Sequence, residues 1–334
     1  MTASPAAVIA DVGGTHTRCA LVTVDGRTDT VQSYRNDRFD DLAHVIREFL
    51  AARGGVSPGH GAFAVAAPIV DDEVRFTNRR WRFSIRALET ALDLKRLQVV
   101  NDFAAQALAL TMLKEADSRP IGGGRPAPGG TRAVLGPGTG LGIAGLVGAC
   151  NGWIAVPGEG GHVTLPAVTP VETRIIARLR ARFGHCSAER VLSGPGLSNL
   201  HSTLAVERGV EGEPLEPEEI TLRASDGDPL ASECLELFFS FLGTLAGDVA
   251  LTFGALGGVY LSGGILPDVA TALEASQFRA RFEDKGRYRE YLARIPTRLI
   301  TIQHPALLGL AYLLTTDARI RPESVSTAET QHST

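Results

Sequence analysis

Short apolar runs alternate with segments of helical periodicity along the first third of the chain. The runs are rich in Val, Ala and Thr and end at polar residues, glycine or proline, which is typical of strands. Between them, apolar residues recur every three or four positions, as they do on the buried face of a helix. The predicted strands are 8–10, 17–24, 30–34, 62–67 and 97–100, and the predicted helices are 39–53, 84–94 and 104–113.

A segment rich in Gly, Pro and Arg, residues 121–131, interrupts this alternation, and a similar series then begins again. The second series has predicted strands at 133–135, 141–147, 153–156, 259–262 and 297–302, and predicted helices at 170–183, 229–253, 279–293 and 305–314. Strands that alternate with helices predict an α/β fold with mainly parallel sheets. The last helix has an apolar face that we expect to pack on the first series. We therefore predict a small α/β domain, a large α/β domain and a disordered tail, with the ranges 1–112 plus 303–320, 113–302 and 321–334.

The composition is that of a globular protein large enough for two hydrophobic cores. The chain has 334 residues, of which 44% are hydrophobic and 21% charged, and this excludes whole-chain disorder, collagen or coiled coil. Lys and Arg number 33 against 37 Asp and Glu, giving a net charge of −4. Without a basic run, the chain has no electrostatic surface for nucleic acid or an anionic membrane, so we expect neither partner.

The cysteines and the long uncharged stretches indicate a cytoplasmic protein. Cys19, Cys150, Cys186 and Cys234 form no CxxC pair, so we expect small buried thiols in a reducing compartment rather than a zinc site or disulfides. Two stretches, 133–158 and 249–267, are long enough to span a membrane. Both are interrupted by glycine and proline, which favours buried strands and ligand loops instead.

The first candidate for chemistry is Asp11-Val12-Gly13-Gly14-Thr15, between two predicted strands. Gly13 and Gly14 let backbone N–H groups approach an anion, and Thr15 adds a hydroxyl donor. Asp11, at the end of a strand, could hold Mg²⁺ through water. The alternative is an ordinary β-hairpin with a glycine turn.

A second glycine–threonine turn, Gly138-Thr139-Gly140, follows about 125 residues later on the repeated strand plan. Two such loops could grip a polyphosphate from both sides. A third motif, Gly263-Gly264, ends a strand and could let a flat adenosine lie against the backbone. A competing interpretation is that residues 140–145 match the dinucleotide fingerprint GxGxxG. That fingerprint requires a following helix, whereas Gly148 and Asn151 here favour a hairpin.

Polar residues interrupt the apolar runs at three further places. Asn101 and Asp102 follow a buried strand, where open α/β sheets bind ligands, although either could simply cap the next helix. Glu159 and His162 lie among glycines that leave room for a ligand, the alternative being a metal ligand or a structural histidine. Glu189 could be a first-turn carboxylate of a helix or a ligand contact.

Taken together, these motifs resemble the bacterial glucokinase family. Their order and spacing match from about residue 9 to about residue 314, through 11–15, 101–103, 138–142, 157–162, 187–194 and 262–265. The resemblance implies a hexokinase/actin-like duplicated fold: two ribonuclease-H-like domains with a ligand cleft between them. It also implies an ATP-dependent glucose 6-kinase that is usually a homodimer, and Mg²⁺ is expected from Asp11. His16 departs from the pattern, because many members have Asn there.

The resemblance assigns roles by position. The residues that match the glucose contacts are Asn101, Asp102, Glu159, His162 and Glu189, with Asp102 as the catalytic base. The residues that match the nucleotide and phosphate segments are Asp11, Gly13, Gly14, Thr15, Gly138, Thr139, Gly140, Gly263 and Gly264. An actin- or chaperone-like ATPase, which would hydrolyse ATP without sugar, is the alternative. Mannose or glucosamine as acceptor, and ADP or polyphosphate as donor, also stay open.

Overall fold

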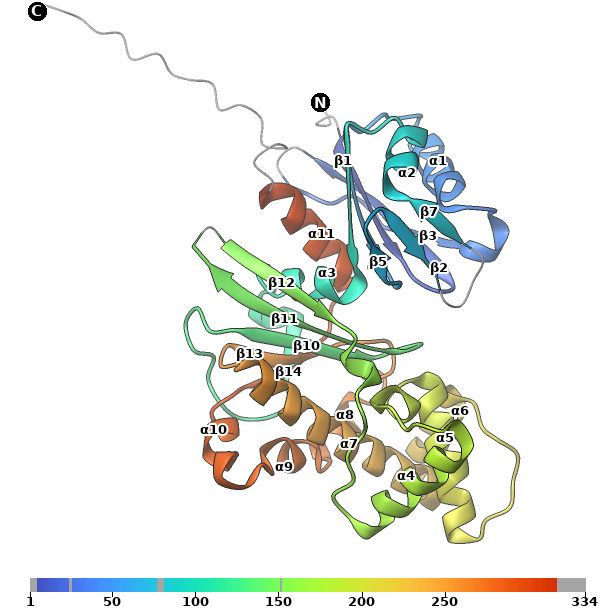
Figure 1. Ribbon diagram of the computed structural model, residues 1–334, viewed down its shortest axis with the longest axis vertical. Coiled ribbons are helices and arrows are strands. Elements are labelled where there is room, and N and C mark those ends of the chain that lie inside the picture. The colour runs from blue at the N-terminus through green and yellow to red at the C-terminus, as the bar shows by residue number, and fades with distance from the viewer. Residues whose placement is uncertain (1–4, 24–25, 77–80, 151, 317–334) are drawn as a thin grey trace, which may run out of the picture. The chain divides into compact units, whose positions relative to one another are not determined.

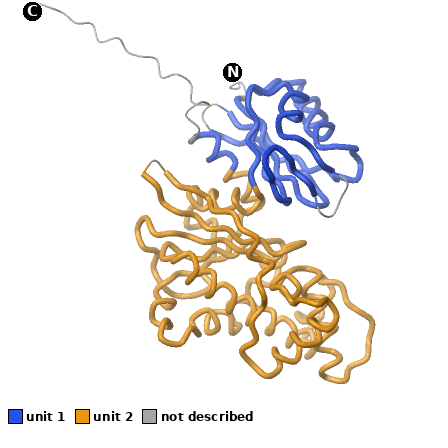
Figure 2. Tube along the Cα trace, in the orientation of Figure 1, with its two compact units in different colours: residues 1–100, 310–334 blue, residues 101–309 orange. Residues whose placement is uncertain are grey.

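The computed structural model describes residues 5–316 except 24–25, 77–80 and 151 (Figure 1). It divides into two compact units, residues 101–309 and residues 1–100 with the chain from 310 onward (Figure 2). The chain passes from one unit to the other near residue 101 and again within the last helix. These units differ from the predicted domains in the assignment of 101–112 and 303–309. The predicted tail, 321–334, lies outside the described residues.

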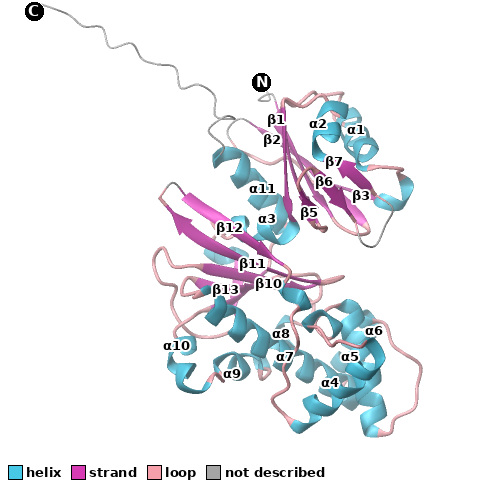
Figure 3. Ribbon diagram, in the orientation of Figure 1, coloured by secondary structure: helices cyan, strands magenta, loops and turns pink. Residues whose placement is uncertain are grey.

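The two large sheets, whose strands are magenta in Figure 3, repeat one strand order, as the restart in the sequence predicted. In sheet order, the first has β3 (Gln32–Arg35), β2 (His16–Thr23), β1 (Pro5–Val12), β4 (His60–Val65) and β8 (Arg96–Asn101). The second has β12 (Gly152–Gly158), β11 (Leu141–Ala149), β10 (Arg132–Pro137), β13 (Gly258–Leu261) and β14 (Thr297–Ile300), with β9 (Ser118–Pro120) added at its edge. A small third sheet has β5 (Ile69–Val70), β6 (Glu73–Arg75) and β7 (Arg82–Ser84).

The prediction of mainly parallel sheets is wrong, because both large sheets are mixed. In each repeat the first strand pairs antiparallel with the second and parallel with the fourth: β1 with β2 and β4, and β10 with β11 and β13. The physical reason is the tight glycine turn between the first two strands. A connection that short can join only antiparallel neighbours, whereas a parallel pair needs a crossover.

Helices occupy most of the remaining chain. They are α1 (Leu42–Ala52), α2 (Ile85–Ala91), α3 (Asp102–Ala109), α4 (Pro170–Phe183), α5 (Gly194–Arg208), α6 (Pro217–Ser225), α7 (Pro229–Phe253), α8 (Ala270–Ala275), α9 (Phe278–Glu283), α10 (Arg289–Ala293) and α11 (Pro305–Thr316). The single helix predicted over 279–293 is wrong: it is α9, a 3-10 turn and α10, interrupted where Gly286 takes a φ of 55°. No helix was predicted over α6 or α8, and the helix expected to begin near Glu189 begins at Gly194, as α5.

The core of the second unit forms around α7. This helix packs on one face of the second sheet, and α3 packs on the other (Figure 1). By length and composition α7 could cross a membrane, but 78% of its most apolar window is buried inside the structure, as in a core helix. Three of the four predicted buried cysteines are buried; Cys150, in the β11–β12 turn, is exposed.

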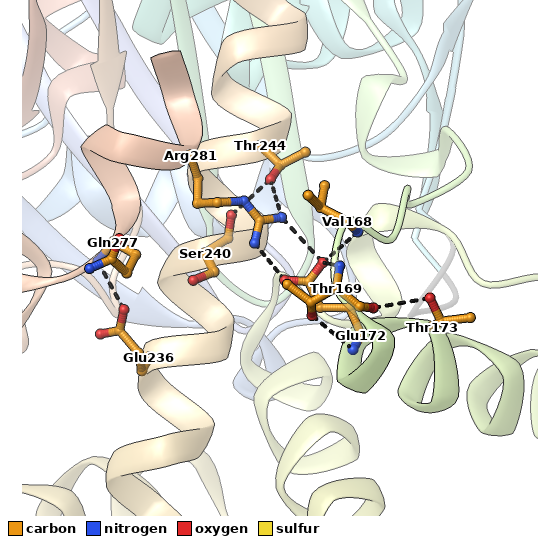
Figure 4. A network of polar contacts seen from close by, with 9 residues as sticks. All are labelled: Val168, Thr169, Glu172, Thr173, Glu236, Ser240, Thr244, Gln277 and Arg281. Carbon is orange, nitrogen blue, oxygen red and sulfur yellow. Dashed lines mark hydrogen bonds and ion pairs between the residues drawn. The ribbon is translucent and has the colours of Figure 1, made fainter. Parts of the chain in front are cut away.

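A buried ion pair fixes the start of α4 against α7 and α9 (Figure 4). Glu172, 1% exposed, accepts hydrogen bonds from Arg281 at 2.6 and 3.2 Å and from the backbone N–H of Val168 at 2.6 Å. Arg281 also donates to Thr244 of α7 at 2.8 Å. Burial alone would raise the pKa of Glu172, but these hydrogen bonds outweigh it and lower the pKa below its usual value.

We predict that this pair gives the fold an acid-sensitive part of its stability. Because the folded-state pKa is lowered, the contribution is present above the unfolded pKa, about 4.3, and is lost as pH falls through the folded value. Glu172→Gln should lower the free energy of unfolding at pH 7 by about 3–5 kcal/mol and flatten its acid dependence. Urea unfolding between pH 3 and 7 measures both effects.

The exposed pair of Glu219 and Arg223 provides the control, since these side chains are 45% and 48% exposed. Glu219→Gln should change the stability by no more than about 0.5 kcal/mol. An acid profile of Glu172→Gln that superimposes on the parent's would refute the assignment.

Candidate active site

The first glycine motif is the turn between β1 and β2, so the hairpin geometry considered as an alternative is present. Gly13 donates its N–H to the carbonyl of His16 at 2.9 Å. Asn36, 1% exposed, braces this turn from behind: its Nδ2 donates to the Gly13 carbonyl at 2.9 Å and its N–H to the Thr15 carbonyl at 2.9 Å. The hydroxyl of Thr17 donates to Asn36 Oδ1 at 2.7 Å. A hairpin turn held in this way keeps its shape without a ligand.

The role of Asn36 in holding the first glycine turn was not predicted from the sequence. It stands in the polar run Asn36-Asp37-Arg38, which is indistinguishable from a solvated surface turn until the strand register is known. The pairing of His16 with Arg35 is what brings this run behind the turn. No local pattern would have revealed it.

Asp11 lies on β1 beside the turn and faces Arg18 on β2, with Nη1 and Oδ2 3.6 Å apart. Burial raises the pKa of Asp11, and the Arg18 charge opposes that rise. Among the described residues no cluster of three His, Cys, Asp or Glu side chains could hold a metal. A single desolvated carboxylate fits Mg²⁺ bound mostly by water and substrate phosphates, which is how this ion commonly binds in kinases.

The second glycine motif forms the corresponding turn between β10 and β11. Gly138 donates to the Gly140 carbonyl at 2.8 Å, and the Gly138 carbonyl accepts from Gly194, the first residue of α5, at 2.8 Å. The residues after the turn continue as β11, which pairs antiparallel with β12. The dinucleotide interpretation is therefore wrong, because no helix follows the glycines to bind a pyrophosphate.

The third glycine motif packs directly against the second. A methyl group on Gly263, whose φ is +101°, would lie 2.1 Å from the carbonyl oxygen of Pro137. Likewise, a methyl group on Gly136 would lie 2.4 Å from the Ser262 carbonyl oxygen. Since β10 and β13 are parallel neighbours, the loops at their carboxyl ends meet, and only glycine permits this backbone approach.

A pocket of about 730 Å³ opens beside these loops within the second unit. Gly138, Thr139 and Gly264 line one side of it, and the opposite walls come from α5 and α6. Ser198, on α5, also lines the pocket, and its hydroxyl is buried with no hydrogen-bond partner in the described part of the chain. The volume and the mixed lining are suited to a nucleoside.

Three distant segments meet at the backbone of Leu141 and Gly142, at the start of β11. Phe103 packs on Gly142, where a methyl group would lie 1.8 Å from its ring. Gly161 packs on Leu141, where a methyl group would lie 2.1 Å from the carbonyl oxygen. Glu189 accepts the N–H of Leu141 through Oε2 at 2.9 Å. These contacts fix the segments that carry the five candidate sugar residues to the second glycine loop.

Asn101 and Asp102 lie where β8 runs into α3. Asn101 Oδ1 accepts the N–H groups of Phe103 at 2.9 Å and Ala104 at 3.2 Å, so its role as a helix cap is confirmed. Asp102 Oδ1 also accepts the Phe103 N–H at 2.9 Å. Both side chains are half-buried, and the carboxylate of Asp102 is bonded to the backbone of the residue whose ring packs on Gly142.

Glu159 and His162 bracket a 3-10 turn, Gly160–His162, at the end of β12. The N–H of His162 donates to the Glu159 carbonyl at 3.0 Å, and both side chains are exposed. Glu189 lies in the first turn of another short helix, the 3-10 helix Ala188–Arg190, which ends before α5 begins at Gly194. The N–H of Ala188 donates to the Val163 carbonyl at 2.9 Å, which joins the two turns.

The candidate residues therefore form two groups, one in each unit. The first unit carries Asp11, Gly13, Gly14 and Thr15. The second carries Asn101, Asp102, Gly138, Thr139, Gly140, Glu159, His162, Glu189, Gly263 and Gly264. The second group holds a nucleoside-sized pocket, a glycine loop, and carboxylates on turns packed against that loop. This is the arrangement needed to transfer a phosphoryl group to a small polar acceptor.

The solved structures that share this fold include sugar kinases. The crystal structure of glucokinase from an Antarctic psychrotroph matches with a TM-score of 0.83 at 34% identity, covering 92% of this chain and 98% of that one. A ROK family glucokinase from Streptomyces griseus shares the fold with a TM-score of 0.62 at 18% identity, covering 92% and 98%. The fold and the candidate site thus define the class of the protein as a sugar kinase.

The sequence comparisons narrow this class to one family. The family model described as Glucokinase matches residues 8–317. Glucokinase from Paramagnetospirillum magneticum is 49% identical over 311 residues, covering 92% of this chain and 97% of the relative. Glucokinase from Nitrobacter hamburgensis is 48% identical over 308 residues, covering 92% and 96%. The chain belongs to the glucokinase family, as the resemblance predicted, and is an enzyme of that family.

We predict that Asn36 shapes the first glycine loop. Asn36→Ala would leave the Gly13 and Thr17 groups without their partner, which should lower the free energy of unfolding by about 1–3 kcal/mol. The KM for ATP should rise more than the KM for the sugar, because the loop carries no candidate sugar residue. Steady-state kinetics with each substrate varied in turn measure this. The neighbouring Asp37→Ala, which loses only an exposed pair with Arg35, should change neither KM; equal effects of the two variants would disprove the brace.

Proposed function

We propose that the enzyme phosphorylates glucose at its 6-hydroxyl with ATP as the donor. The observation that carries the proposal is the packing of Phe103 on Gly142, which fixes Asp102 relative to the second glycine loop. A carboxylate held beside a phosphate-binding loop can accept a proton where phosphoryl transfer begins. Two solved structures with this fold support glucose and ATP as the ligands. One is a glucokinase in complex with glucose, and the other is the Streptomyces griseus glucokinase in complex with glucose and AMPPNP.

In this scheme, both the proton transfer and the binding of the sugar are assigned to particular residues. Asp102 takes the proton of the 6-hydroxyl while that oxygen bonds to the γ-phosphorus of ATP and the bond to the ADP oxygen breaks. Asn101, Glu159, His162 and Glu189 bind the other sugar hydroxyls. Such a site discriminates strongly between sugars. A sugar that lacks one hydroxyl leaves a polar group of the protein unpaired, which costs about 1–3 kcal/mol of binding free energy per missing partner.

The glycine loops hold the nucleotide. Gly138, Thr139 and Gly264 border the pocket for adenosine. The first loop, 13–15, binds phosphate with the N–H groups of Gly14 and Thr15 and the Thr15 hydroxyl, while the Gly13 N–H closes the turn. Asp11 would hold Mg²⁺ through water, and when bound this ion neutralises charge on the phosphates. A ligand cleft between two domains and a homodimer stay predictions from the resemblance, and a cytoplasmic location stays a prediction from the cysteines and the uncharged stretches.

Asp102→Asn tests the central role. Asparagine keeps an oxygen that can accept the Phe103 N–H, so α3 should start as before and the protein should fold. We expect kcat to fall about 10²–10⁴-fold, the usual contribution of a general base, with glucose affinity by calorimetry changed less than about threefold. Coupled assays with and without glucose measure turnover and also detect sugar-independent ATP hydrolysis, which would favour an ATPase instead.

Asp228→Asn is the matched control, since Asp228 likewise caps a helix, α7, through a bond from the Ala231 N–H at 2.8 Å. It removes the same charge from a helix start outside the candidate site and should leave kcat unchanged. If Asp102→Asn folds and keeps the parent's turnover, Asp102 is only a cap or a sugar ligand.

A further inference from the structure

The carboxylate of Glu189 occupies the space left free by a glycine of the second loop. Its Oε2 accepts the N–H of Leu141 at 2.9 Å, and a methyl group on Gly140 would lie 2.5 Å from the same oxygen. Leu141 directly follows the 138–140 turn that borders the nucleoside pocket. Glu189 is half-buried, and no hydrogen bond to its second oxygen, Oε1, is found among the described residues. One oxygen thus holds the loop while the other is available to a ligand.

The turn that carries Glu189 holds the same loop at its other end. The hydroxyl of Ser193 donates to the Glu189 carbonyl at 2.8 Å and accepts the N–H of Gly196 at 3.0 Å. Between these residues, Gly194 donates its N–H to the Gly138 carbonyl at 2.8 Å. The loop is therefore bound at both ends by the short segment 189–194. A change in the Glu189 side chain therefore changes the conformation of the loop that borders the nucleoside pocket.

We propose that Glu189 is a positioning residue for the nucleotide loop and couples sugar binding to ATP binding. This inference rests on the proposed function. A sugar hydroxyl that donates to Oε1 restricts the carboxylate to the rotamer in which Oε2 meets the Leu141 N–H. The bond that already holds the loop in the structure is then kept for more of the time, so ATP binding bears a smaller entropy loss. By linkage, ATP raises the affinity for the sugar by the same factor.

The quantity to measure is the coupling factor, which is the Kd of AMPPNP without glucose divided by its Kd with saturating glucose. Calorimetry gives the Kd of AMPPNP without glucose and with saturating glucose, and the reverse pair of titrations checks reciprocity. We expect the parent to bind AMPPNP about fivefold or more tightly when glucose is present, within the range usual for linked sites. In Glu189→Gln one oxygen is replaced by an NH₂ group, which cannot accept the sugar hydroxyl while the remaining oxygen accepts the Leu141 N–H. Its coupling factor should fall to within about twofold of unity.

Glu159→Gln is the matched control, because Glu159 is a candidate sugar ligand on the exposed turn with no side-chain bond to the loop. It should weaken glucose binding yet keep the parent's coupling factor at saturating glucose. Gly140→Ala is the second variant, and it disturbs the same contact from the loop side. It should also lose coupling, which protects the test should Glu189→Gln not fold.

The outcomes separate the inference from the proposed function. A parent that phosphorylates glucose but shows a coupling factor of one refutes the inference alone. So does a folded Glu189→Gln that loses glucose affinity and keeps the parent's factor, because Glu189 would then be a sugar ligand only. A parent that neither binds nor phosphorylates glucose overturns the proposed function and the inference together. Loss of coupling in Glu189→Gln and Gly140→Ala, but not in Glu159→Gln, supports the assignment.

Discussion

Close backbone packing around Leu141 and Gly142 is the constraint on which the candidate site of the second unit depends. Gly142 has no side chain because the ring of Phe103 fills that space, and Gly161 has none because the Leu141 carbonyl does. Interiors packed this tightly cannot accept a further methyl group without moving their neighbours. Here the neighbours carry the chemistry, since Phe103 follows Asp102 and Gly161 precedes His162. The glycines therefore set the geometry of residues that they do not themselves contact.

The two glycine–threonine turns are each stabilised by a distant side chain, which is an amide in the first turn and a carboxylate in the second. Each joins an antiparallel pair of strands, and each is bound from behind by a side chain far away in the sequence, Asn36 for the first and Glu189 for the second. Glycine turns lose much conformational entropy on ordering, so an unbraced loop would bind phosphate weakly. An amide and a carboxylate that satisfy loop backbone groups organise the turns beforehand, which is what phosphoryl transfer requires of its binding groups. The carboxylate differs in having a second oxygen available for a ligand.

Most of the chain plan could be predicted from apolar periodicity and glycine motifs. The strands of both repeats, α4 and α7 follow from local patterns and from caps such as Thr169 and Gly254. The helix expected to begin near Glu189 begins later, as α5, and its extent was not predicted because it starts Gly-Pro-Gly and its apolar residues form no simple stripe. Asn36 and Phe103 were not found as site residues because their importance arises from strand register and from a contact between distant segments. The bond from Leu141 to Glu189 spans 48 positions, and no local spacing indicates it.

The most direct test of this account is the effect of one methyl group on β11. In Gly142→Ala the new methyl group must displace Phe103, and with it Asp102. We expect the variant to fold and its kcat to fall about tenfold or more, because small misplacements of catalytic groups cost about that much or more. Gly148→Ala lies on the same strand, and its nearest neighbours, at 3.5 and 3.8 Å, would be ordinary contacts, so it should keep the parent's kcat. A crystal structure of each variant would show whether Phe103 has moved. A Gly142→Ala enzyme with displaced Phe103 and unchanged turnover would contradict the account.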